Sequence, residues 1–138
     1  MHIINRTRDV VPFTTKDGST IREILAPRNA PGTLQNQSLA EATLAPGAAT
    51  TPHYHPRTEE IYYIVQGTGE MRLGPEVQIV GPGDAVAIPP GAPHQIVNTQ
   101  AQTDLLFLCC CAPAYSHEDT VLVDDVTWPV PIRGGPQP

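Results

Sequence analysis

Three histidines and one glutamate in the middle of this chain have the types and the spacing of metal ligands. His53 and His55 are two residues apart, Glu60 follows shortly after them, and His94 lies in a second run that covers residues 83–98. Side chains two residues apart on a β-strand point to the same face, so the imidazoles of His53 and His55 would project together. Imidazole and carboxylate ligands suit a divalent ion such as Mn, Fe, Ni, Cu or Zn. The sequence therefore predicts a site for one divalent transition metal.

Four protein ligands would leave two positions open on an ion that prefers six ligands, for water, O2 or a bidentate substrate. Structural metal sites are closed, whereas catalytic sites keep an open position. The ligand types do not choose among the metals, because availability and geometry decide that. The pattern thus favours chemistry or ligand capture at the ion and leaves the identity of the ion open.

The segments that carry these residues have the features of short β-strands. Sixteen prolines and eleven glycines interrupt the chain and leave little room for a long helix. Runs bounded by turn residues predict strands at 9–13, 20–25, 37–44, 60–65, 69–73, 77–80, 85–88, 95–98 and 104–111. At most a single helical turn is expected, within residues 113–125. Many short strands of this kind predict an all-β fold, an antiparallel barrel or sandwich.

The central part of the chain, residues 47–98, resembles the cupins, a family of small jelly-roll barrels. The first cupin motif is Gly, five residues, His-x-His, three or four residues, Glu, six residues, Gly; the second is Gly, five residues, Pro-x-Gly, two residues, His, three residues, Asn. All ten motif positions are present here, as Gly47, His53, His55, Glu60, Gly67, Gly83, Pro89, Gly91, His94 and Asn98. The resemblance implies a double-stranded β-helix with little or no helix, and the three histidines and the glutamate as ligands of one ion.

Two neighbouring glutamates, Glu59 and Glu60, compete for the ligand role. Neighbours on a strand point to opposite faces, so only one of them can serve. The resemblance selects Glu60, because six residues separate it from Gly67. Glu59 is then expected to be a solvated carboxylate, and His2 and His117 are expected to be surface residues.

A few polar residues near the ligands in sequence could orient an imidazole or contact a substrate. Tyr62 shares the face of Glu60, and these two residues are the candidates for a catalytic role. The other polar residues near the site in sequence are Gln66, Glu70, Arg72 and Gln95. Glu70 and Arg72 are more simply interpreted as residues on the solvent-exposed face of a strand.

The cysteines form an unusual adjacent group, Cys109, Cys110 and Cys111. Neighbouring cysteines on a strand point to opposite faces and do not easily meet disulfide geometry, and the group lacks the spacing of a zinc motif. We expect small apolar fillers in a reducing compartment, one of which could face inward and line the pocket.

The 138 residues predict one domain, with an N-terminal arm and edge strands at 1–35, the barrel at 36–128 and a Pro/Gly-rich tail at 129–138. The net charge is −6 and no cluster of Lys or Arg is present, so nucleic-acid and anionic-membrane partners are disfavoured. No run approaches the length of a membrane-spanning segment, and a cytoplasmic location is expected. Resembling cupins often pair through N-terminal strands, and an exposed edge strand favours pairing, so a homodimer is expected.

Two classes of function fit these features. An enzyme could bind a small carboxylate, enediol, β-diketone or sugar at the ion and carry out oxygenase, isomerase, decarboxylase or lyase chemistry. Small cupins cover all of these reactions, so the resemblance does not choose among them. No inner lysine or extra histidine stands out as a general base, which favours chemistry on the metal itself. The alternative is a barrel that binds or senses a small carboxylate or sugar without turnover; an empty structural barrel is disfavoured by the intact ligand set.

Overall fold

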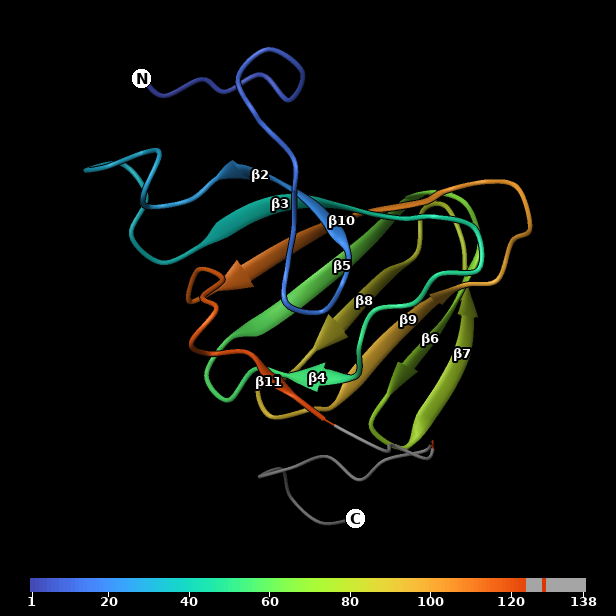
Figure 1. Cartoon of the computed structure of the whole chain (residues 1–138). Helices are drawn as coiled ribbons and strands as arrows, with labels where there is room; N and C mark the ends of the chain where they lie inside the picture. Colours follow the sequence, from blue (N-terminus) through green and yellow to red (C-terminus); the bar gives the residue numbers. More distant parts are fainter. Residues whose placement is uncertain (124–127, 129–138) are drawn as a thin grey trace.

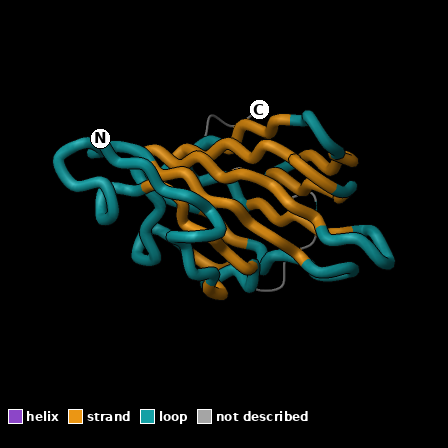
Figure 2. The backbone as a smooth tube through the Cα atoms, turned by 90° about the horizontal axis from the view of Figure 1, so that it is seen from above, coloured by secondary structure: helices purple, strands orange, loops and turns teal. Residues whose placement is uncertain are grey.

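The computed structural model describes residues 1–123 and 128, and its regular elements are strands in two antiparallel sheets. The six-stranded sheet has the order β1 (Phe13–Thr14), β2 (Thr20–Leu25), β3 (Ser38–Leu44), β10 (Leu105–Ala112), β5 (Glu59–Gln66) and β8 (Ala85–Ile88). The five-stranded sheet has the order β11 (Val121–Leu122), β4 (His53–Tyr54), β9 (His94–Asn98), β6 (Gly69–Leu73) and β7 (Glu76–Val80). Figure 1 shows the sheets folded against each other, and Figure 2 shows the same barrel from above. The predicted all-β jelly-roll barrel is confirmed.

Period-two alternation explains why these segments become strands of a closed barrel. Along β5, Glu60, Tyr62 and Ile64 are buried, whereas the residues between them are exposed. The same alternation continues on β10 and β9, and the apolar core between the sheets includes Leu44, Ile64, Ile96, Leu105 and Phe107. The interior therefore has an apolar part and, next to it, the part that holds the buried histidines.

Most of the predicted strands are present to within one residue at each end, and the exception is 9–13. That prediction is wrong: residues 6–9 form a turn, in which the side-chain oxygen of Asn5 accepts hydrogen bonds from the backbone N–H groups of Thr7 and Arg8, each at 3.0 Å, and residues 10–12 have no regular structure. Only Phe13 enters a strand there. β4 and β11 were not predicted, since two residues are too few to show alternation.

The helical turn expected within 113–125 is absent from its described part, residues 113–123, which contains bends, turns and β11. Tertiary contacts hold this segment: the Asp119 carboxylate accepts hydrogen bonds from the backbone N–H groups of Arg57 (3.2 Å) and Thr58 (3.0 Å). The tail predicted at 129–138 lies outside the described residues, and no helix in the described part of the chain is long and apolar enough to cross a membrane. The domain boundaries and the homodimer stay predictions.

All four motif glycines have the positive φ that a side chain would resist, for example +73° at Gly47 and +87° at Gly67. At Gly67 space is lacking as well, because a Cβ atom there would lie 2.6 Å from the Gln100 side chain and 2.7 Å from the carbonyl oxygen of Asp104. The turn between β5 and β6 therefore needs glycine.

The N-terminal hairpin brings a distant segment to the mouth of the barrel. β2 pairs with β3, and the turn between β1 and β2 lies against the segment before β4, where the backbone N–H of Thr51 donates to the carbonyl oxygen of Asp17 (2.6 Å). In Figure 1 this dark blue hairpin descends in front of the barrel toward β4. Asp17 is thereby fixed beside the histidine-bearing strands.

Asn98, the last position of the second motif, joins three parts of the chain from a fully buried site. Its side-chain NH2 donates to the carbonyl oxygens of Leu44 (3.1 Å), Ala45 (3.2 Å) and Thr103 (2.8 Å). Buried carbonyls that lose their donors cost free energy, so Asn98→Ala is expected to lower the free energy of unfolding by about 2–4 kcal/mol.

Chemical denaturation of the metal-free protein measures this loss. Asn36→Ala is the matched control, since Asn36 is exposed, and it is expected to change stability by less than about 0.5 kcal/mol. Equal effects of the two substitutions would contradict the structural role of Asn98.

Candidate metal centre

The three histidines predicted as ligands come together on the five-stranded sheet. His53 on β4 lies directly opposite His94 on β9, and their ring centroids are 4.2 Å apart. His55 follows β4, with its ring 5.1 Å from that of His53. All three side chains are buried. Strand pairing explains one contact, and the same-face rule for residues two apart explains the other.

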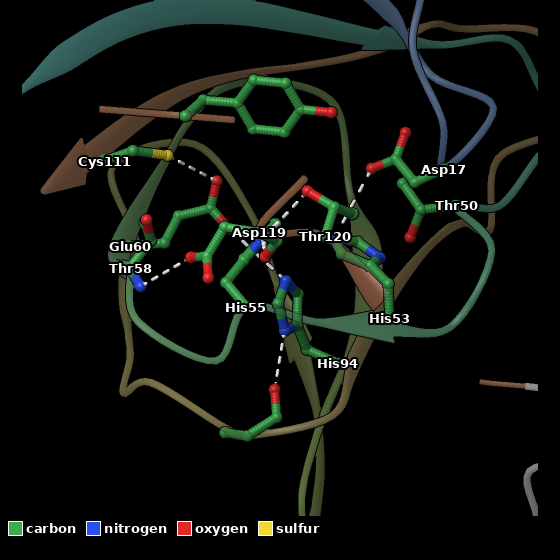
Figure 3. Close-up of polar contacts among 12 residues, drawn as sticks. Asp17, Thr50, His53, His55, Thr58, Glu60, His94, Cys111, Asp119 and Thr120 are labelled. Carbon is green, nitrogen blue, oxygen red and sulfur yellow. Dashed lines mark hydrogen bonds and ion pairs between the residues drawn. The ribbon is translucent and has the colours of Figure 1, made fainter. Parts of the chain in front are cut away.

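The glutamate reaches the histidines from the six-stranded sheet. Glu60 lies on β5 and is buried, and its Oε1 is 3.4 Å from Nε2 of His55 and 3.4 Å from Nε2 of His94. One ligand atom from each of the four residues lies within 4.8 Å of the others (Figure 3). The cluster therefore bridges the two sheets, and Glu59, which is exposed, is not part of it.

Backbone carbonyls fix how each imidazole presents its nitrogens. Nδ1 of each histidine lies within hydrogen-bond distance of a backbone carbonyl oxygen. The distances are 2.7 Å from His53 to Thr51, 3.2 Å from His55 to Asp119 and 2.9 Å from His94 to Ala92. A carbonyl oxygen only accepts, so each Nδ1 carries a proton and each Nε2 is directed at the cluster. This arrangement, in which the outer nitrogen donates and the inner nitrogen is a ligand, is typical of histidines that bind metal.

The carboxylate of Glu60 is oriented in a similar way. The thiol of Cys111, opposite Glu60 across β5 and β10, donates to Oε2 at 3.1 Å. Glu60 Oε1 and His94 Nε2 are buried without a hydrogen-bond partner among the described residues. Leaving such groups unpaired is costly unless something binds them. A cation among the four ligand atoms would satisfy both, so the residues present fit a divalent metal ion.

The protonation states of the cluster follow from its burial and its charges. Burial, together with the imidazoles of His94 and His55, lowers the pKa of His53 to about 3. Burial alone would raise the pKa of Glu60, but His55 and His94 outweigh it and hold that pKa well below its ordinary value. Burial lowers the pKa of His55, yet the Glu60 carboxylate more than offsets this and the net pKa is raised. A proton on His55 therefore competes with a metal ion at pH values below the raised pKa of that residue.

A cavity opens from the cluster, and its wall includes His53, His55, Glu60 and Tyr62. Further polar residues in the wall are Thr15, Asp17, Ser19, Glu23, Ser38, Tyr115 and Thr120. Burial raises the pKa of Asp17, although two hydrogen bonds from Ser19 oppose the change. The cavity is therefore a mixed apolar and polar pocket, with oxygen-bearing side chains close to the candidate metal ligands.

Tyr62, predicted to be catalytic, lies in this cavity wall. Its ring meets His94 edge-on at 5.9 Å and packs against Phe107 at 4.7 Å, so it separates the histidines from the apolar core. Burial raises the pKa of Tyr62 well above its ordinary value, and its hydroxyl keeps its proton at neutral pH. A role for Tyr62 is thus restricted to donating or accepting a hydrogen bond as a phenol.

The other polar residues near the motifs lie outside the cavity, so the contact with the site that was considered for Gln66 and Gln95 is wrong. Gln66 is exposed and donates to the carbonyl oxygen of Asp104 at 3.3 Å. Arg72 donates to Glu70 at 2.6 Å and to Gln95 at 3.0 Å. In the β6–β9 register these positions alternate with the inward-facing ones, so they form one outer face of the sheet, as expected for Glu70 and Arg72.

Some residues around the site were not predicted from the sequence. Asp17 was not among the candidates, because its place in the cavity depends on a contact with a segment more than thirty residues away. Tyr115 and Thr120 reach the cavity from the irregular segment after β10. Among the cysteines, Cys109 and Cys111 face inward and Cys110 is exposed, as alternation predicts, and all three are free thiols. The hydrogen bond from Cys111 to Glu60 adds a function that a filler would not have.

Comparisons with known proteins agree with the geometry. The family profile described as "Cupin domain" matches residues 40–111. An uncharacterized protein of Methanocaldococcus jannaschii is 46% identical over 125 residues, which are 90% of this chain and 98% of that protein.

Two solved structures extend the comparison to the fold. The polyketide cyclase RemF of Streptomyces resistomycificus superimposes with a TM-score of 0.71 at 26% identity, over 94% of this chain and 89% of RemF. Oxalate decarboxylase of Bacillus subtilis superimposes with a TM-score of 0.73 at 25% identity, over 90% of this chain and 32% of that enzyme. With both motifs, both sheets and this family profile in agreement, the chain belongs to the cupin family.

Proposed function

We propose that this protein is an enzyme that holds one divalent transition metal through His53, His55, Glu60 and His94 and acts on a small substrate that binds through oxygen atoms. The observation that carries this proposal is the cluster itself: four buried ligand atoms within 4.8 Å, two of them lacking any other partner. The cavity supports catalysis over a purely structural ion, because three of the ligand side chains form part of its wall.

The reaction class that fits the cavity is non-oxidative chemistry of the isomerase, lyase or cyclase type. A bound divalent ion would supply Lewis-acid polarisation of a substrate oxygen. The chain adds a phenol that stays protonated at Tyr62 and a carboxylate at Asp17. Burial raises the pKa of Cys109 and Cys111, so neither thiol is ionised and ready to act as a nucleophile. The wall therefore offers groups that position a substrate or handle its protons.

The likeness to RemF supports the same class, since that protein is a polyketide cyclase. Ring closure of a polyketide proceeds through an enol or enolate next to a carbonyl, which is an oxygen-chelating substrate of the kind proposed here. We therefore place enolisable ketones, enediols and sugars before molecules that would require oxygenation.

The test is turnover by the metal-loaded protein with β-diketones, enediols and small sugars, followed by NMR in sealed anaerobic samples. We expect product without O2, and loss of product after chelation of the metal. Product that forms only with stoichiometric uptake of O2 would contradict the non-oxidative class. Tight binding without any turnover would support the alternative, a cupin that binds or senses a small ligand.

The role of Tyr62 is tested with the active substrate. Tyr62→Phe removes only the buried hydroxyl and is expected to lower kcat by about 100-fold, as loss of a hydrogen-bond donor to a charge that develops on the substrate does. Tyr63→Phe is the matched control on the same strand, because Tyr63 is exposed on the opposite face and should leave kcat unchanged. Unchanged kcat in Tyr62→Phe would show that Tyr62 only packs.

A further inference from the structure

The outer side of the six-stranded sheet is apolar over three neighbouring strands. On β5, Ile61 and Tyr63 point outward and are 49% and 45% exposed. β5 pairs with β8 on one side and with β10 on the other, so outward side chains line up in rows across the three strands. Together they form the apolar face, which consists of the row Ala87, Ile61 and Cys110 and the row Ala85, Tyr63 and Leu108.

This face differs from the outer side of the other sheet. A solvated face of an antiparallel sheet normally carries polar residues. The five-stranded sheet follows this rule with Glu70, Arg72 and Gln95, which are hydrogen-bonded to one another. None of the six residues of the apolar face carries a charge, although the strands already bury their inner side chains in the core. A contiguous exposed apolar surface of this kind marks a site of protein association.

The N-terminal arm, residues 1–12, borders the apolar face. Glu41 points outward from β3 directly opposite Leu108, and Nε and Nη2 of Arg6 donate to its two carboxylate oxygens, each at 2.6 Å. The arm therefore lies against the outer side of β3, beside β10 and β5 (Figure 1). It has exposed apolar side chains of its own, Ile3 at 71% and Val11 at 83%. The arm thus continues the apolar face without leaving the charges of Arg6 and Glu41 unpaired.

The size of this surface indicates what covers it. β5 and β10 have eight residues each, and three strands of that length cover roughly 350 Å² in outline. Each partner in a stable protein complex buries about 800 Å². The apolar face is therefore large enough for the centre of an interface, and the arm must supply part of the remainder.

Charge decides which partner fits. The chain has a net charge of −6, which disfavours an acidic partner, and a basic partner would find no carboxylate among the six residues of the apolar face. A second copy meets the uncharged face with the same uncharged face about a two-fold axis. The net charges of the two copies stay on solvent-exposed surfaces, where salt screens their repulsion.

We propose that two copies of this chain form a dimer by packing their apolar faces against each other, with each N-terminal arm lying against the partner chain. The two sheets would then stack face to face, as in a β-sandwich. β5 carries Glu60 on its inner side and Ile61 on its outer side, so the dimer braces the strand that positions the candidate ligand. The inference does not need a metal ion and stands apart from the proposed function.

Sedimentation velocity over a range of protein concentrations tests the dimer. The wild type is expected to have twice the 14.8 kDa mass of one chain. Ile61→Lys places a charge in the middle of the interface and is expected to weaken the dimer by at least about 100-fold, because that charge would be buried without a partner. Ile79→Lys is the matched control, since Ile79 is an exposed isoleucine on β7 of the other sheet, and it should leave the dimer intact.

The thiol of Cys110 provides a second measurement that needs no variant. Cys110 is exposed on the single chain, whereas Cys109 and Cys111 are buried. We expect a maleimide to react with Cys110 at least about tenfold more slowly in concentrated, dimeric wild type than in protein diluted to the monomer.

Several results would overturn the dimer through this face. A wild type that is a monomer at every concentration contradicts it, and a monomer whose Cys110 is nevertheless protected would show that another part of the chain covers the face. A dimer in which Cys110 reacts as fast as in the monomer, or which Ile61→Lys and Ile79→Lys weaken equally, would place the interface elsewhere.

Discussion

His55→Ala is expected to weaken the binding of a divalent transition metal by more than about 100-fold. The substitution removes a ligand, and loss of a residue that only hydrogen-bonds to a ligand already lowers metal affinity by about 10–100-fold. The substitution removes an imidazole whose Nε2 is 3.4 Å from Oε1 of Glu60 and whose Nδ1 is fixed by Asp119. Turnover should be lost together with metal. Competition with a chromophoric chelator measures the affinity, and the melting temperature of the metal-free variant verifies that it folds.

His117→Ala is the matched control for this experiment. It makes the same substitution at an exposed histidine in the segment that also carries Asp119, and we expect wild-type affinity. Retained metal affinity and activity in His55→Ala would contradict the assignment of the ligands. Equal losses in both variants would point to general damage to the fold.

Removal of the metal is expected to destabilise the whole barrel, because the cluster joins its two sheets. A ligand that binds only the folded state stabilises it by about 3–4 kcal/mol when its free concentration is 100–1000 times Kd. For a domain of this size that corresponds to a melting temperature on the order of 10 °C higher than that of the metal-free protein. Thermal unfolding with and without saturating Zn²⁺ measures the difference.

The effect should be specific for transition metals and should depend on pH. Ca²⁺ and Mg²⁺ prefer oxygen ligands, so they are expected to give no shift at a site with three imidazoles. The proton on His55 competes with the metal at pH values below the raised pKa of that residue. Near neutral pH no proton competes at His53, whose pKa is about 3, or at Glu60, which is ionised. Metal affinity should therefore fall by up to about tenfold per pH unit as pH decreases below the pKa of His55, and level off above it. A stabilisation by Zn²⁺ that is equal at pH 6 and pH 8 would contradict this coupling.

The candidate ligands could be predicted from the sequence because local rules determine their positions. His53 and His55 share a face by strand periodicity, and the motif spacing selects Glu60 over Glu59. Most strands could be predicted from runs bounded by turn residues, and buried positions recur at every second residue along β5, β9 and β10. Where alternation was lacking, as in β4 and β11, the strands were missed.

The remainder of the pocket could not be predicted, for two physical reasons. Inward-facing and outward-facing positions alternate along β6 and β9. Leu73 and His94 form an inward-facing pair, so the next pair, Arg72 and Gln95, faces outward. In addition, Asp17 reaches the cavity only because its hairpin packs across the mouth of the barrel. The residues of the motifs thus indicate a metal, while Asp17, which lines the cavity beside the candidate ligands, lies outside the motifs.

The most direct test of this account is the metal content of the wild-type protein, measured by elemental analysis after reconstitution with Zn²⁺, Mn²⁺, Fe²⁺, Co²⁺ or Ni²⁺ and removal of free metal. We expect about one bound transition-metal ion per chain, as for a single site with four ligands. Less than about a tenth of an ion per chain with every one of these metals would contradict the metal site.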